Sequence, residues 1–345
     1  MCRACCGARS RGSSPRRRAS LARVKYRKLG RTGLRVSEIG YGAWGIGGAQ
    51  WGGADDDESI RALGRAIDLG LNFVDTALAY GSGHSERVVG KVVRERRETV
   101  FVATKVPPKN GIWPAPDGLA VEEVFPGDHV RGCAERSLAN LGLDAIDLLQ
   151  LHVWSDEWAG RGDLLETVDE LRSEGKIRFF GISVNDHQPA NVLRMIETSA
   201  IDTVQAIYNV FDQSPEDELF PACREHDVGV IARVPLDEGG LTGRIGPDTE
   251  FPGDDFRAHY FRGDRRRQVH DRAQAIAADL GIPEDGLAET ALRFVLAEPT
   301  VSTVIPGMRS IRNVERNVAV SGGRALSDGR REKLRAHRWV RDFYA

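Results

Sequence analysis

Short apolar runs and segments with helical periodicity alternate along this chain from Leu34 onward. The apolar runs predict strands at 36–39, 73–75, 100–104, 147–151, 177–182, 203–207, 228–232 and 301–305. Apolar positions with helical spacing predict helices at 56–69, 84–95, 128–141, around 164–171, after Pro189, and at 215–226, 264–279, 286–297, 310–318 and 328–337. Strict alternation of this kind produces parallel sheets, and eight units fit the closed (β/α)8 (TIM) barrel of the α/β class.

Polar residues end three of the predicted strands. Asp75, Lys105 and His152 each follow an apolar run, and Tyr80 comes five residues after Asp75 in a loop bounded by glycine. The carboxyl ends of parallel strands lie on one face of a barrel, and active sites form on that face. We therefore expect the three side chains to meet there, with the phenol of Tyr80 leaning over them.

These four residue types are chemically complementary. A phenol with a pKa of about 10 is a poor acid at neutral pH. The ammonium of Lys105 would favour the phenolate of Tyr80, and Asp75 would hold that ammonium in place. His152 would orient a substrate carbonyl or share its proton. A buried Lys–Asp pair that only stabilises the barrel is the alternative for Asp75 and Lys105.

Composition narrows the class of protein. The 345 residues are 41% hydrophobic and carry a formal net charge of -2, so no global field recruits nucleic acid or a membrane. The five cysteines do not resemble a disulfide framework, which favours a reducing, cytoplasmic compartment. Cys2 and Cys5 are spaced like a metal or redox pair, but no second ligand pair of matching spacing follows.

The first 24 residues differ from the rest of the chain. They are rich in arginine and serine and contain no acidic residue. They lack the apolar segment of a secretory signal and the amphipathic content of a transit peptide. We predict a disordered basic extension at 1–24 and a single barrel domain at 25–345.

Gly40 to Gly45 satisfies the G-x-G-x-x-G pattern of dinucleotide-binding folds. The third glycine of that motif begins a helix, whereas here further glycines follow, and they disfavour a helix. The segment is better interpreted as a loop that lines a pocket, with Trp44 and Trp51 as candidate walls.

With Asp75, Tyr80, Lys105 and His152 in this order, each within its local motif, the chain resembles the aldo-keto reductase superfamily over about residues 26 to 340. The resemblance implies a (β/α)8 oxidoreductase that uses NADPH and no metal. Hydride would pass from the nicotinamide to a carbonyl carbon, and Tyr80 would give the oxygen its proton. Asp75 and Lys105 would tune Tyr80, and His152 would steer the carbonyl.

The same resemblance implies a set of cofactor-binding residues. Ser183 and Gln205 match the ligands of the nicotinamide carboxamide, but the neighbouring position, which is often asparagine, is Val184 here. Arg233 stands where some members have an aromatic residue or a serine against the nicotinamide. The full set comprises Gly42, Trp44, Asp75, Ser183, Gln205, Arg233, Leu236, Gly307, Arg309, Ser310, Asn313 and Asn317.

Different parts of that set would meet different parts of NADPH. Gly42 and Trp44 would lie near the nicotinamide, and the stretch around Leu236 would clasp the pyrophosphate. Gly307, Arg309 and Ser310 open a helix and would approach the adenosine 2′-phosphate, with Asn313 and Asn317 nearer the adenine. Arg309 favours NADPH over NADH.

Two alternative functions remain open from the sequence. A Schiff-base aldolase would use Lys105 as nucleophile, but such a lysine would have to be desolvated without a carboxylate partner, and Asp75 argues against that. A cofactor-sensing regulatory barrel without turnover is the second. The expected partner is a small carbonyl or alcohol, chosen by loops at 44–54, 107–127, 154–162 and 236–263, where Trp113, Trp154 and Trp158 are candidate pocket walls.

Overall fold

A computed structural model of the chain describes residues 24–48, 50–116, 118–339 and 341–344. Eight strands form one sheet in the order β10-β9-β8-β7-β6-β5-β4-β3, and every neighbouring pair is parallel. The bridges Ile39–Val304 and Gly42–Gly307 join its two edges into a ring. The strands are β3 (Tyr41–Gly42), β4 (Phe73–Asp75), β5 (Phe101–Val106), β6 (Ile146–Leu151), β7 (Ile177–Ser183), β8 (Thr203–Ile207), β9 (Gly229–Arg233) and β10 (Val301–Val304).

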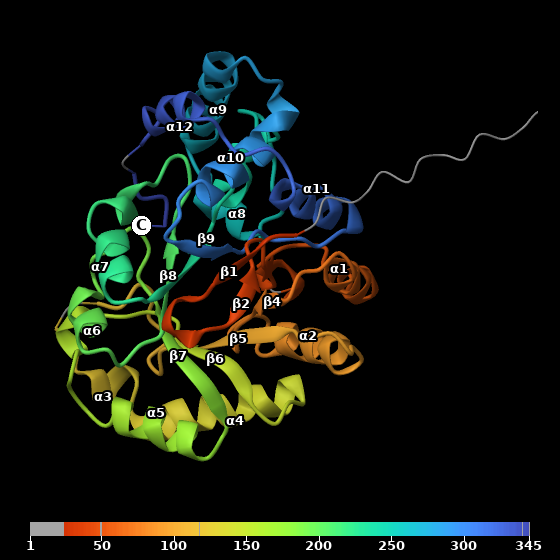
Figure 1. Cartoon of the computed structure of the whole chain (residues 1–345). Coiled ribbons are helices and arrows are strands. Elements are labelled where there is room, and N and C mark those ends of the chain that lie inside the picture. The colour runs from red at the N-terminus through yellow and green to blue at the C-terminus, as the bar shows by residue number, and fades with distance from the viewer. Residues whose placement is uncertain (1–23, 49, 117, 340, 345) are drawn as a thin grey trace, which may run out of the picture.

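Helices surround this ring and follow its strands, as Figure 1 shows. The (β/α)8 prediction is therefore confirmed. Alongside β3 to β10, the helices are α1 (Asp56–Asp68), α2 (His84–Arg94), α3 (Val121–Val124), α4 (Gly127–Leu141), α5 (Leu164–Ser173), α6 (Leu193–Glu197), α7 (Leu219–Glu225), α8 (Phe256–Tyr260), α9 (Arg265–Leu280), α10 (Leu287–Leu296), α11 (Ile311–Ser321) and α12 (Asp328–Arg335).

The start of α1 illustrates how local sequence specifies these helices. The side chain of Asp55 caps the helix by accepting a hydrogen bond from the backbone N–H of Glu58 at 2.7 Å. Three acidic residues in its first turn also favour the positive end of the helix dipole. The short helices α3 and α8 lie in stretches that were predicted to be loops, because neither is long enough to show a helical period.

One predicted barrel strand was wrong. Val36 and Ser37 do not belong to the ring but to β2 (Arg35–Ser37), which pairs antiparallel with β1 (Tyr26–Lys28). This hairpin packs Leu29, Leu34 and Val36 against the amino-terminal end of the barrel, in one apolar cluster with Phe73, Leu148 and Ile231. In Figure 1 the hairpin crosses the ring near its centre.

The first barrel strand is β3, inside the segment predicted to be a glycine-rich loop. It has only two residues, so it leaves no apolar run in the sequence. Gly42 is required there because a side chain would bring its Cβ to 2.6 Å from the carbonyl oxygen of Ile305. The glycines that resemble a dinucleotide motif thus permit the ring to close.

The proposed basic extension at 1–24, with Cys2 and Cys5, lies outside the described residues except for Val24. The side chain of Val24 is buried in the main core. Within the described residues, no helix is long and apolar enough to cross a membrane.

Candidate active site

The carboxyl end of the barrel brings Asp75, Lys105 and Tyr80 into direct contact. The ammonium of Lys105 donates to Asp75 Oδ2 at 2.6 Å, to the backbone carbonyl of Thr76 at 2.9 Å and to the Tyr80 oxygen at 3.3 Å. Asp75 ends β4, and Lys105 lies on the adjacent strand β5. Both are almost completely buried, with 2% and 1% of their surface exposed.

A tight turn after β4 positions Tyr80. Gly81 has a φ of 60°, and a side chain there would bring its Cβ to 2.1 Å from the carbonyl oxygen of Gly47. The indole of Trp44 stacks on the phenol at 6.2 Å between ring centroids. The imidazole of His152, which follows β6, stands edge-on to the same phenol at 5.7 Å. The four residues therefore share one site.

Burial sets the protonation of this group. Burial raises the pKa of the Tyr80 phenol, and the Lys105 ammonium lowers it only in part, against an opposing contribution from Asp75. Burial and the positive charges of Lys105 and Arg233 hold the pKa of His152 well below 6.5. Burial alone would lower the pKa of Lys105, but Asp75 and Tyr80 outweigh it, and the pKa is raised.

As expected, the charge and hydrogen bond of Lys105 lower the pKa of the Tyr80 phenol, but burial outweighs them and the pKa is raised overall. The sequence indicates which charges lie near the phenol but not how far the phenol is removed from water. At neutral pH the site holds a neutral phenol, a charged ammonium and a neutral imidazole.

A second layer of amides holds the other carboxylate oxygen of Asp75. Gln205 Nε2 donates to Asp75 Oδ1 at 2.8 Å, and Gln150 Nε2 donates to the same oxygen at 3.2 Å. Gln205 was expected only as a cofactor ligand. Gln150 was missed, although it is a polar residue in an apolar strand two positions before His152, and residues two apart point to the same face.

The next three strands carry the residues expected around a nicotinamide. Ser183 ends β7 and lies in register with Gln205 on β8, and both are buried. Arg233 ends β9, and its Nη2 donates to the carboxylate of Asp186 at 2.6 Å and to the carbonyl oxygen of Val184 at 3.0 Å. Asp186 was missed because its partner lies 47 residues away.

The segment after β10 carries the residues expected near the adenosine phosphate. Ser310 caps α11 by accepting from the backbone N–H of Asn313 at 3.3 Å. Arg309 donates to the carbonyl oxygens of Trp51 and Gly52 at 3.3 and 3.1 Å. The other expected members of this region are exposed Gly307, half-buried Asn313 and buried Asn317.

Arg309 is close to a second guanidinium. Burial and the positive charge of Arg257 lower the pKa of Arg309. Arg257 stacks over the indole of Trp51 and pairs with the carboxylate of Asp255 at 2.7 Å. The carboxylates of Asp255 and Glu58 act on Arg309 in the opposite sense, so two arginines and two carboxylates lie near the start of α11. Arg257 lies in α8, which the sequence did not predict.

Gly42 and Leu236, the two remaining residues of the expected cofactor site, lie in β3 and after β9. The backbone N–H of Gly42 donates to the carbonyl oxygen of Pro306 at 3.1 Å, so Gly42 joins β3 to the segment after β10. Leu236 is half-buried and precedes Asp237 and Glu238, two residues with φ of 51° and 52°. Such strained backbone in non-glycine residues is concentrated at functional sites.

The carboxyl-terminal segment holds that strained stretch in place. Tyr344 donates its hydroxyl hydrogen to Glu238 Oε1 at 2.9 Å, and Arg341 pairs with the buried carboxylate of Asp237. Glu238 is buried, and burial raises its pKa to about 7. No local pattern near the end of the chain indicated these contacts.

Aromatic rings line the mouth of the site. Trp113 stands edge-on to His152 at 5.7 Å and is 47% exposed, and Phe256 packs on Trp44 at 5.1 Å. Trp154 and Trp158 were expected to line the same mouth, and this is wrong. Both are at most 1% exposed and pack against each other in the core.

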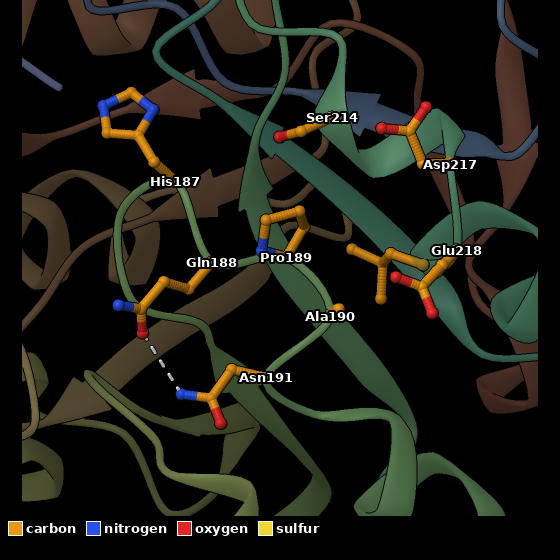
Figure 2. Close-up of a pocket in the computed structure, with 9 residues that line it drawn as sticks. His187, Gln188, Pro189, Ala190, Asn191, Ser214, Asp217 and Glu218 are labelled. Carbon is orange, nitrogen blue, oxygen red and sulfur yellow. Dashed lines mark hydrogen bonds between the residues drawn. The ribbon is translucent and has the colours of Figure 1, made fainter. Parts of the chain in front are cut away.

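A separate cavity of about 470 Å³ lies between the loop after β7 and the start of α7 (Figure 2). Its lining includes Asn191, Ser214 and Asp217, whose polar atoms are already engaged. Asn191 donates to the carbonyl oxygen of Trp154, Ser214 donates to Asp212, and Asp217 pairs with Arg338. This cavity contains none of the four residues that meet at the strand ends.

The fold and the site define a barrel oxidoreductase with a phenol, an ammonium and a carboxylate in contact at its rim. Residues 38–338 match the model of the Aldo/keto reductase family, and the chain belongs to this family. It is an oxidoreductase of carbonyl compounds and alcohols. The aldo-keto reductase YhdN of Bacillus subtilis (strain 168) is 30% identical over 326 residues, which cover 90% of this chain and 92% of YhdN.

Solved structures of similar proteins agree with this assignment. The holo form of aldo-keto reductase AKR11C1 from Bacillus halodurans superposes with a TM-score of 0.72 at 30% identity, covering 91% of this chain and 96% of that one. An aldo/keto reductase from Klebsiella pneumoniae in complex with NADP and acetate has a TM-score of 0.64 at 27% identity, covering 92% and 98%.

Proposed function

We propose that this chain is an NADP(H)-dependent oxidoreductase that interconverts aldehydes, ketones or sugar carbonyls with the corresponding alcohols. The observation that carries the proposal is the position of the Lys105 ammonium, within hydrogen-bond distance of both Asp75 and Tyr80. A structural ion pair would not need a phenol at its third contact, beside the imidazole of His152.

In the proposed mechanism, NADPH supplies the hydride when it is bound. Tyr80 gives its proton to the carbonyl oxygen of the substrate, since the raised pKa keeps the phenol protonated at neutral pH. The ammonium of Lys105 then stabilises the phenolate that remains, and Asp75 balances the charge of Lys105. His152 is neutral and donates a hydrogen bond that orients the carbonyl.

A dinucleotide would bind along the part of the rim formed by the ends of β7, β8 and β9 and by the segment after β10. We assign the nicotinamide to the ends of β7, β8 and β9, where a buried guanidinium nitrogen, Nε of Arg233, has no partner among the described residues. The guanidinium groups of Arg257 and Arg309 suit the adenosine 2′-phosphate, which favours NADPH over NADH. The strained stretch at 237–238 would clasp the pyrophosphate.

We also infer the type of substrate and the cellular compartment of the protein. The exposed indole of Trp113 at the mouth suits a substrate with an apolar or aromatic group next to its carbonyl. Cys133 and Cys223 are free thiols among the described residues, which supports a reducing cytoplasm.

A turnover screen tests the proposal. NADPH oxidation is followed with a panel of aldehydes, ketones and sugars, and NADP⁺ reduction with the matching alcohols, for the native chain and for Tyr80→Phe. We expect Tyr80→Phe to lose about 100- to 10,000-fold in turnover while NADPH binding is retained. Tyr26→Phe is the matched control because Tyr26 lies in the hairpin at the opposite end of the barrel.

Two outcomes would redirect the assignment. Tight NADPH binding without turnover on any substrate would favour a regulatory cofactor-sensing barrel. Undiminished turnover in Tyr80→Phe would remove Tyr80 as the proton donor. Dissociation constants for NADPH and NADH decide the coenzyme, and tighter binding of NADH would overturn that choice.

A further inference from the structure

Arg233 is a half-buried cation for which the proposed function names no specific contact. Its side chain is 17% exposed, and Nη2 is held by Asp186 and by the carbonyl oxygen of Val184. Its Nε–H is buried and has no acceptor among the described residues. A guanidinium stays protonated, so this N–H is available to donate to an oxygen of a ligand.

Arg233 faces the same space as the proton donor. Its positive charge acts on the pKa of both Tyr80 and His152, which stand on other parts of the rim. In the ring of strands, β9 lies beside β8, and Arg233 is in register with Ile207, two residues beyond Gln205. Arg233 therefore stands one strand away from Gln205, at the rim level where the nicotinamide is assigned.

The segment that follows β7, two strands from β9, lacks an amide donor at the matching place. Val184 is apolar and 2% exposed, and its backbone N–H already donates to the carbonyl oxygen of Gln205 at 3.0 Å. Asn185 does not compensate, because its oxygen accepts from Ala115 N–H at 3.2 Å and its nitrogen donates to the carbonyl oxygen of the same residue at 3.3 Å. Asn185 thus ties down the loop after β5.

We propose that the Nε–H of Arg233 donates to the carbonyl oxygen of the nicotinamide carboxamide, in place of the side-chain amide that is absent at Val184. Asp186 and the Val184 carbonyl orient the guanidinium for this contact. This inference rests on the proposed NADP(H) dependence and deepens it by naming the residue that recognises the carboxamide.

The test compares two ligands that share every group except the nicotinamide. Dissociation constants of NADPH and of 2′-phospho-ADP-ribose are measured by protein fluorescence or calorimetry for the native chain, Arg233→Leu and Arg233→Lys. For both variants we expect NADPH to bind about 10- to 100-fold more weakly, since each loses a hydrogen bond from a charged donor. The binding of 2′-phospho-ADP-ribose should change less than about twofold.

A rescue variant sharpens the test. Val184→Asn in the Arg233→Leu background places an amide donor just after β7, two strands from β9, and it should recover most of the lost NADPH affinity. Arg178→Leu is the matched control because Arg178 also lies on the barrel sheet but is half exposed and pairs with Asp147. Thermal unfolding identifies any variant that fails to fold, and Arg233→Lys keeps the positive charge if Arg233→Leu does fail.

Three results would overturn the inference. An equal loss for both ligands would assign Arg233 to the pyrophosphate clasp. Unchanged NADPH affinity with a raised KM for carboxylate-bearing aldehydes would assign it to the substrate. Unchanged affinity without any such effect would make Arg233 structural. If instead the native chain binds no NADPH at all, the proposed function itself fails, which is a different result.

Discussion

The two halves of the barrel rim differ in how their charged side chains are held. At β4 to β6, each oxygen of Asp75 has a partner, and the Lys105 ammonium makes three contacts. On the other half, the Nε of Arg233 has no partner in the described part of the chain, and Arg309 donates to backbone carbonyls and lies near the ring of Trp51. The ion pair of the first half is complete before any ligand binds, although Nδ1 of His152 is, like Nε of Arg233, buried without a partner among the described residues.

This difference fits the division of labour that we propose. A proton donor must be oriented before the substrate arrives, because reorientation during the reaction would raise the barrier. A cofactor site instead gains affinity from donors that stay unsatisfied until the cofactor binds.

Lys105→Met should cause the largest loss of both stability and turnover. It leaves the Asp75 carboxylate buried without its cation, which should cost about 3–5 kcal/mol of stability. Turnover should fall at least about 100-fold because the phenolate loses its support. Denaturant unfolding and steady-state kinetics measure both effects.

The control for this variant is Lys28→Met. Lys28 pairs with Asp227 at 2.7 Å, close to the 2.6 Å of Lys105 and Asp75, but both side chains are more than half exposed. Its loss should cost less than about 1 kcal/mol and leave turnover intact. Similar losses of stability in the two variants would mean that burial does not distinguish the two pairs.

Glu238→Gln should change the pH dependence of stability on the other half of the rim. Burial raises the pKa of Glu238 to about 7 in the folded chain, against the ordinary value of 4.5. The hydrogen bond from Tyr344 and the charge of Arg233 oppose this shift, whereas the charges of Asp237 and Asp186 add to it. Because the folded chain binds this proton more tightly, stability is favoured below pH 4.5 and is lost as the pH rises through 7. The loss amounts to about 3 kcal/mol at most.

The variant removes this titration, so its stability relative to the native chain should be higher at pH 8 than at pH 5. Urea unfolding of the free protein at both pH values measures the difference. Glu315→Gln, at an exposed pair with Arg65, is the surface control. A difference between native chain and Glu238→Gln that is the same at pH 5 and pH 8 would contradict the raised pKa.

Gln150→Leu and Gln205→Leu should distinguish support of Asp75 from binding of the cofactor. Each removes one hydrogen bond to Asp75 Oδ1, at 3.2 Å and 2.8 Å respectively, and each should cost about 1.5–3 kcal/mol of stability. Only Gln205→Leu should also weaken NADPH binding, because Gln205 is assigned to the nicotinamide carboxamide and Gln150 is not. Equal NADPH affinity in the two variants would leave Gln205 as a support of Asp75 only.

The rate of reduction should depend little on pH around neutrality. The pKa of Tyr80 is raised above 10 and that of His152 lies well below 6.5, so neither group changes protonation between about pH 7 and 9. Turnover in the reducing direction should stay nearly constant in that window and fall only at higher pH, as Tyr80 loses its proton. A decline with a midpoint near pH 8 would show that Lys105 outweighs burial in the working enzyme.

Much of the fold was predictable because its signals are local. The apolar runs at 147–151 and 177–182 match β6 and β7 to within one residue at each end. The first barrel strand was not predictable, since β3 has two residues and depends on the close approach of Gly42 to Ile305. The pocket walls were predicted in part: Trp113 lies at the mouth, whereas Trp154 and Trp158 complete the core.

The sequence by itself determined the alternation of strands and helices and placed Asp75, Lys105 and His152 at strand ends, because side-chain periodicity is a property of neighbouring residues. Only the tertiary structure decided that Gln205 and Gln150 share one oxygen of Asp75, that burial outweighs Lys105 at Tyr80, and that Arg233 keeps an unsatisfied donor. Those outcomes depend on distances across the barrel and on the exclusion of water, which no local segment contains.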